Sequence, residues 1–176
     1  EDQKARDIRS MAEKIWSSKI NATLIHPTLT YDAPGSNNVE RIVRFCSLSP
    51  FIPIPKKGNT LIQPVSASDL LQGLLTCLKD DETIGRTIIA AGGTPLSYKN
   101  FIESCASSAG KKTKVIFFPL LPMKILARFT RLIPGVPSIT ASELERLFEN
   151  KNFSNDEFRK LLGREPLTFP ETLKGT

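Results

Sequence analysis

Apolar positions with helical spacing alternate along the chain with short apolar or β-branched runs. Helical spacing covers residues 4–18, 38–48, 66–78, 97–109, 121–132, 141–149 and 155–162. The runs between these segments, at 23–25, 57–65, 86–91 and 114–118, are typical of strands. This alternation predicts an α/β fold for residues 1–176, taken as a single domain or as part of a larger one.

Local signals sharpen several of these boundaries. Ser66 and Asp69, and likewise Ser154 and Glu157, have the spacing of a capping box at a helix start. Ser97 is placed to cap the helix that follows it. Prolines in the stretch SPFIPIP, residues 49–55, are expected to exclude regular structure there. The helix that begins near residue 66 carries an apolar stripe that we expect to face the core, formed by Leu70, Leu71, Leu74, Leu75 and Leu78.

The strongest functional signal is the stretch ATLIHPTLTYDAPG, residues 22–35. It begins as a strand and ends in a polar turn, which is where open α/β sheets place their ligand sites. His26 is either a ligand contact or a structural histidine, and Tyr31 is either a phenol for proton transfer or a packing residue. The alternative for the whole stretch is a core strand with an ordinary loop.

Composition narrows the function classes. The chain is 40% hydrophobic with a net charge of +6, and its basic residues are scattered without interleaved aromatic residues, which argues against nucleic-acid binding. The three cysteines are far apart in sequence and His26 is the one histidine, so we expect no metal site and buried thiols in a reducing, cytoplasmic compartment. No apolar run approaches the roughly 20 residues that span a membrane.

Four segments resemble the extended and atypical short-chain dehydrogenase/reductases, the superfamily of nucleoside-diphosphate-sugar epimerases and dehydratases. HPTLTYDAPG is similar to its RPxxxYGPG segment, with His26 in place of the usual Arg and Asp32 in place of the usual Gly. LIQPVSASDLLQGLL and GRTIIAAGGTPLSYKNFIE are similar to two later segments of that family. The tail from residue 117 onward is similar to the atypical branch, which includes the accessory NAD(P)H-binding subunit of respiratory complex I.

The resemblance implies that this chain is the C-terminal, substrate-binding part of a Rossmann-type protein whose dinucleotide-binding half is absent. The parent protein would use NAD or NADP on a nucleotide-sugar or another small substrate. A glycine-rich cradle for a pyrophosphate is missing, since Gly92-Gly93 lacks a third glycine. We therefore expect no dinucleotide to bind this chain alone with a dissociation constant below about 1 mM.

The resemblance also places the family's catalytic Tyr-x-x-x-Lys pair. If Ala12-Glu13 is the family's Ala-Glu, the pair falls on Ala5 and Arg9, which cannot perform the acid/base step; otherwise it lies upstream. Whether the parent protein is an enzyme stays open, and this chain alone is expected to be inactive. The residues expected to face substrate or cofactor are His26, Pro27, Thr28, Tyr31, Gln63 and Ser66.

Two functions remain. One is the substrate half of an NAD(P)-dependent epimerase, dehydratase or related oxidoreductase. The other is a non-catalytic relative that serves in assembly or as a membrane-proximal scaffold. Lys124, Arg128 and Arg131 form a basic side of a predicted helix, which we expect to lie in water and not on a membrane surface. An apolar face left open by the absent half leads us to expect self-association.

Overall fold

A computed structural model describes residues 3–18, 21–32, 37–55, 59–110, 114–119 and 150–170 of the chain, with side chains at 3–6, 8, 9, 37, 38 and 55 left out. Its helices are α1 (Gln3–Ser17), α2 (Asn37–Leu48), α3 (Ala67–Cys77), α4 (Tyr98–Ser108), α7 (Asp156–Leu162) and the short 3-10 helix η1 (Asp81–Thr83). Its strands are β1 (Leu24–Pro27), β2 (Thr30–Tyr31), β3 (Phe51–Pro55), β4 (Leu61–Ile62), β5 (Val65–Ser66), β6 (Thr87–Ala90), β7 (Leu96–Ser97) and β8 (Lys114–Phe118).

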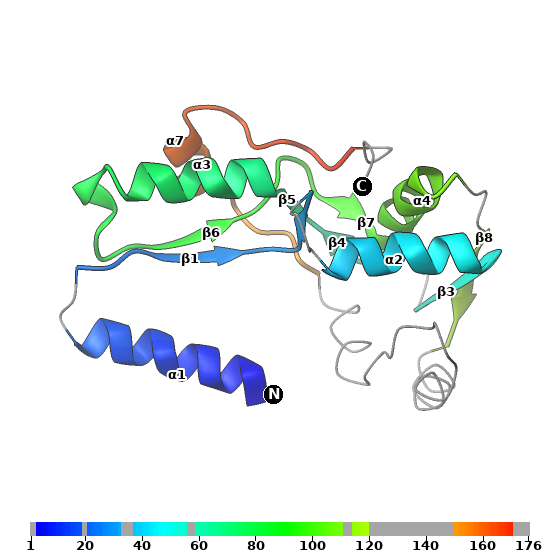
Figure 1. Cartoon of the computed structure of the whole chain (residues 1–176), viewed down its shortest axis with the longest axis horizontal. Helices are drawn as coiled ribbons and strands as arrows, with labels where there is room; N and C mark the ends of the chain where they lie inside the picture. Colours follow the sequence, from blue (N-terminus) through cyan, green and yellow to red (C-terminus); the bar gives the residue numbers. More distant parts are fainter. Residues whose placement is uncertain are drawn as a thin grey trace.

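The described strands pair into two-stranded sheets (Figure 1). The pairs β1–β6, β2–β5 and β3–β8 are parallel, and β4–β7 is antiparallel. Parallel strands need a long crossover connection, and the helices between successive strands supply it. The predicted α/β class is therefore confirmed.

One core cluster lies between the β1–β6 pair and the helices α3 and α7. Ile88 and Ala90 of β6 are buried, and they pack in a cluster with Phe158 and Leu162 of α7. Ile25 of β1, the register partner of Ile88, packs against the same cluster. Side chains alternate between the two faces of a strand, so the intervening residues face the other way. In Figure 1, α1 lies on that other side of the pair.

A second cluster lies around α2, α4 and β3. Phe101 and Cys105 of α4 are fully buried, together with Cys46 of α2 and Ile54 of β3. The rings of Phe101 and Phe169 lie 5.0 Å apart between their centroids. Phe169 thereby brings the end of the described chain into this second cluster.

Residues 150–170, which we call the strap, connect the two clusters. Phe158 belongs to the first cluster and Phe169 to the second. At the start of the strap, the backbone N–H of Lys151 donates to the carbonyl of Leu61 at 2.8 Å. The strap is thus part of both cores and holds the two halves of the described structure together.

The structure corrects the prediction for residues 49–55. β3 occupies Phe51–Pro55 and pairs in parallel with β8. Ile52 and Ile54 are buried, and the prolines at 53 and 55 alternate with them. Because alternate residues of a strand direct their N–H groups to opposite edges, these prolines remove donors from one edge only, which suits a strand paired on one side among the described residues.

The leucine stripe of α3 is also corrected. Leu71, Leu74, Leu75 and Leu78 are 58%, 43%, 48% and 83% exposed. Of the predicted stripe, Leu70 alone packs against a core cluster. The helix buries Asp69 and Gly73 instead, and a Cβ on Gly73 would lie 2.6 Å from the Phe158 ring. Gly73 therefore allows the close approach of α3 and α7.

Two of the predicted helix starts are confirmed and one is wrong. The hydroxyls of Ser66 and Ser97 accept hydrogen bonds from the first turns of α3 and α4. At α7 the cap residue is Asn155, while the Ser154 hydroxyl bonds to Asp156 Oδ2 at 2.7 Å. The run 57–65 is also wrong as a single strand, because β4 and β5 divide it.

The helices predicted at 121–132 and 141–149, with their basic side chains, lie outside the described residues. Within the part of the chain that is described, no helix is both long and apolar enough to span a membrane.

Candidate functional site

The carboxyl ends of β1 and β6 meet at Thr28. Its backbone N–H donates to the carbonyl of Ala90 at 3.0 Å, and its hydroxyl donates to the carbonyl of Gln63 at 2.6 Å. Three separate segments therefore converge at the predicted ligand-binding end of the sheet. Thr28 is half-buried here and its one hydroxyl proton is engaged, although the oxygen can still accept a hydrogen bond.

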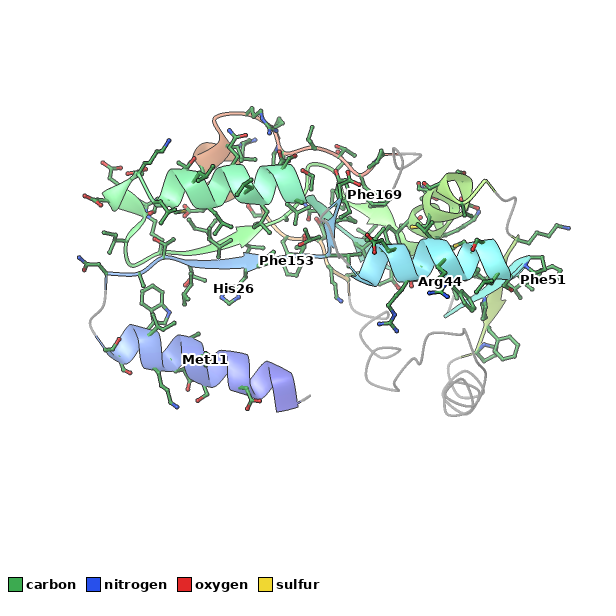
Figure 2. All side chains as sticks on the ribbon, viewed as in Figure 1. Met11, His26, Arg44, Phe51, Phe153 and Phe169 are labelled. Atoms are coloured by element: carbon green, nitrogen blue, oxygen red, sulfur yellow. The ribbon has the colours of Figure 1, made fainter. Side chains whose placement is uncertain are left out.

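His26 is the exposed polar side chain at this strand end. It lies opposite Ile89 in the register of β1 and β6, and Ile89 is 37% exposed. Figure 2 shows the imidazole pointing from β1 to the side on which α1 lies, away from α3. No hydrogen bond within the described residues holds the ring. The alternative that His26 is a structural histidine therefore gains no support.

His26 lies beside side chains that offer polar and apolar contacts at the surface. A neutral imidazole offers one donor and one acceptor. Pro27 beside it is exposed, and Ile89 adds an apolar surface on the neighbouring strand.

Among the described residues, no group of three or more His, Cys, Asp or Glu side chains is placed to hold a metal ion.

Tyr31 is buried and not presented to a ligand. Its side chain is 2% exposed, its hydroxyl donates to the carbonyl of Thr168 at 3.4 Å, and its ring meets that of Phe169 edge-on at 4.9 Å. Burial, with smaller contributions from Asp32 and Asp69, raises the pKa of Tyr31 to about 12. A phenol held this firmly in its neutral form is poorly suited to accept a proton at neutral pH.

Asp32 ends the polar stretch in an unusual backbone conformation. Its φ is 58°, in the left-handed region, which glycine adopts most easily and Asp tolerates better than most residues. The position is the one at which the resembled family usually carries Gly. Desolvation by burial raises the pKa of the Asp32 carboxyl.

Gln63 and Ser66 are buried and use their polar groups within the chain. Gln63 is 3% exposed; its amide N–H donates to Gly92 O at 2.8 Å, and its oxygen accepts from the N–H of Phe153 at 3.0 Å. Ser66 is 2% exposed, and its hydroxyl oxygen accepts from the N–H of Asp69 at 3.1 Å. Gln63 lies beside Thr28, and Ser66 pairs with Tyr31 in the register of β2 and β5. Their buried polar groups stabilise these strand ends from the interior of the protein.

The turn at Gly92 and Gly93 is filled by protein. A Cβ on Gly92 would lie 1.9 Å from the carbonyl oxygen of Pro64, and the N–H of Gly93 donates to the carbonyl of Leu167 at 3.1 Å. Asn155 donates to Gly92 O at 3.0 Å. These glycines serve close packing against the strap, and the Gly93 amide is not free to bind a phosphate.

Sequence reasoning missed a buried ion pair. Asp69 is fully buried; its Oδ1 accepts from Arg164 Nη2 at 2.5 Å, and its Oδ2 accepts from the N–H of Leu167 at 2.6 Å. The capping-box spacing of Ser66 and Asp69 predicts only that the carboxylate serves the start of its own helix. An acidic residue in the first turn of an otherwise apolar helix was the available signal, but its partner lies 95 residues away.

The fold is shared with solved structures. An epimerase of nucleoside-diphosphate sugars from Staphylococcus aureus matches with a TM-score of 0.61 at 19% identity, over 89% of this chain and 53% of that one. The UDP-glucuronic acid 4-epimerase of Bacillus cereus, solved with UDP-glucuronic acid and NAD, matches with a TM-score of 0.59 at 14% identity, over 89% and 45%. These likenesses establish the fold.

An epimerase from Methanothermobacter thermautotrophicus matches similarly, with a TM-score of 0.59 at 15% identity over 89% of this chain and 42% of that one. No protein-family model and no curated protein sequence matches the chain. The chain therefore shares the mixed α/β fold of these solved structures and spans about half of their length.

Proposed function

We propose that this chain is the substrate-side half of an NAD(P)-dependent nucleoside-diphosphate-sugar epimerase, dehydratase or related oxidoreductase. The observation that carries the proposal is the position of His26. It is an exposed, unengaged imidazole at the carboxyl end of a parallel strand, in a fold shared with epimerase structures. That end of an open α/β sheet is where ligands bind.

In this proposal His26, Pro27 and Thr28 face the sugar or the nicotinamide end of the site. The imidazole would orient a hydroxyl or carboxamide, and Ile89 would support the ring that lies against it. Gln63 and Ser66 hold the strand end in place through their buried hydrogen bonds. NAD or NADP would be held elsewhere in the parent protein, since the Gly92 turn does not fit a pyrophosphate.

One observation favours the second function, a non-catalytic relative. In the register that aligns Ala12-Glu13, the catalytic pair falls on Ala5 and Arg9, and both positions lie in α1. α1 lies on the side of β1 to which His26 points (Figure 2). Without a phenol at position 5 and an ammonium at position 9, the helix would leave a binding surface that performs no proton transfer.

The test uses His26 as its own reporter, because the chain contains one histidine. The imidazole C–H resonance is followed by NMR while UDP-glucuronic acid, UDP-glucose, nicotinamide mononucleotide or AMP is added to about 10 mM, a range suited to weak binding. We expect saturable shifts with the sugar nucleotides or the nicotinamide nucleotide, and none with AMP.

Two matched variants localise the effect. Ile89→Ala should weaken the response, and Ile116→Ala, which removes a side chain of similar exposure on β8, should not. An imidazole signal that no ligand moves would contradict the proposed site. A response that survives Ile89→Ala unchanged would contradict the position of the ligand on β1 and β6.

A further inference from the structure

The outer face of α3 is an apolar surface without a partner among the described residues. We define the leucine face as Leu71, Leu74, Leu75 and Leu78, which are 43% to 83% exposed. The other side of the helix packs against the first core cluster through Leu70 and Cys77, and it also buries Asp69 and Gly73. A helix that is apolar on both sides normally has protein on both sides, and a contiguous exposed patch of this kind marks an interaction surface.

We propose that the leucine face binds the leucine face of a second copy of this chain, with the two α3 helices antiparallel. The spacing 71, 74, 75, 78 is symmetric about the point between Leu74 and Leu75. A two-fold axis through that point places Leu71 at the same level along the pair as the other copy's Leu78, and Leu74 at the level of its Leu75. A surface that complements itself in this way forms a closed, isologous dimer.

Charge favours the same direction of pairing. Asp80, Asp81 and Glu82 follow α3 after Leu78 and Lys79, and Asp81 and Glu82 are exposed. In an antiparallel pair these carboxylates lie beside the N-terminus of the other copy's α3, whose partial positive charge attracts them. A parallel pair would place the two acidic runs together, and they would repel each other. The inference does not depend on the proposed function.

The first test is the mass of the 176-residue chain by light scattering after size exclusion, from about 1 to 100 μM, the range of ordinary dimer affinities. We expect a concentration-dependent dimer. Leu74→Glu and Leu75→Glu should each raise its dissociation constant at least ten-fold, because a carboxylate would be buried without a partner. Leu48→Glu, at a 60% exposed leucine of α2, is the matched control and should leave the dimer intact.

A second test checks direction without disturbing the face. In a Cys77→Ala background, Leu75→Cys should form a disulfide between copies, since the two residues lie about 1.5 Å apart along antiparallel axes. Leu78→Cys should not, because its copies lie about 10 Å apart along those axes. A chain that stays monomeric at every concentration would overturn the proposal. A leucine face that binds a different protein while the chain stays monomeric would overturn it as well. So would a dimer that Leu74→Glu leaves intact, or a Leu78→Cys disulfide.

Discussion

The buried ion pair between Asp69 and Arg164 should be the interaction on which the strap depends most. Asp69 lies fully buried at the start of α3, and Arg164 of the strap has a 42% exposed side chain. Replacing Arg164 with Met keeps much of its volume but leaves the carboxylate buried with the Leu167 amide as its remaining strap partner. The variant therefore isolates the cost of an unpaired buried charge.

The expected cost follows from burial. Removing one partner of a fully buried ion pair costs about 3–5 kcal/mol. Water reaches Arg164, which lowers the expected loss in unfolding free energy to about 2–3 kcal/mol. For a chain of this size, with a urea dependence of about 2 kcal/mol per molar, the urea midpoint should fall by roughly 1–1.5 M.

The control is another arginine of the strap. Arg159 pairs with Asp156 at 2.9 Å and with Glu165 at 3.1 Å, but all three side chains are exposed. Arg159→Met should therefore cost about 0–1 kcal/mol. Equilibrium urea unfolding, followed by circular dichroism, measures both variants.

A double-mutant cycle then assigns the loss to the pair. Asp69→Asn removes the charge, so adding Arg164→Met to it should cost about 1–2 kcal/mol less than adding it to the original chain. The reasoning fails if Arg164→Met costs no more than Arg159→Met. It also fails if the two substitutions at the pair are simply additive.

Three further outcomes are expected. Gly92→Ala should lower the free energy of unfolding by several kcal/mol, because its Cβ would lie 1.9 Å from the carbonyl oxygen of Pro64 and overpack the backbone. Gly110→Ala is the control: the space around Gly110 is open, but its φ of 66° favours glycine, so the same urea titration should show a loss of only about 1 kcal/mol. Burial raises the pKa of Cys46 to about 11 and of Cys105 to about 12. Below about pH 9 both thiols are neutral in the folded and the unfolded chain, so they do not change the free energy of unfolding. Above that pH the unfolded thiols ionise first, and the free energy of unfolding falls by up to about 1.4 kcal/mol per pH unit for each thiol as the pH rises toward 12. A urea midpoint equal at pH 8 and 10.5 would contradict this, and Cys105→Ala should reduce the fall. NAD and NADP titrated by calorimetry should bind the chain more weakly than about 1 mM, and micromolar affinity would reveal a phosphate site that the Gly92 turn does not provide.

Sequence patterns determined the local features of this protein. Ser66 and Ser97 cap their helices, and each hydrogen bond spans three residues. Gly163 ends α7 with φ 67°, as expected of a glycine at that position. The alternation of helical and strand periodicities was sufficient to predict the α/β class. Signals of this kind are readable because cause and effect lie within one or two turns of the chain.

The site was only partly readable in this way. The predicted strand at 23–25 corresponds to β1, but β1 extends through His26 to Pro27. β2 occupies Thr30 and Tyr31 within the expected polar loop. The structure leaves His26 exposed near the end of β1. The sequence could not tell that Tyr31, five residues later, would be covered by Phe169, because that contact depends on where the strap returns. Gln63 is likewise buried by a partner 90 residues away, the N–H of Phe153.

Only the tertiary structure decided which side of α3 is buried. The leucines satisfied the helical period, yet the helix packs through Asp69 and Gly73, because Arg164 neutralises the first and Phe158 fills the space beside the second. Hydrophobic periodicity records that a helix has an apolar face, but a helix that is apolar on two sides has no single inward direction. The choice rests with residues 158 and 164, far along the chain, whose contacts with α3 exist only once the strap is in place.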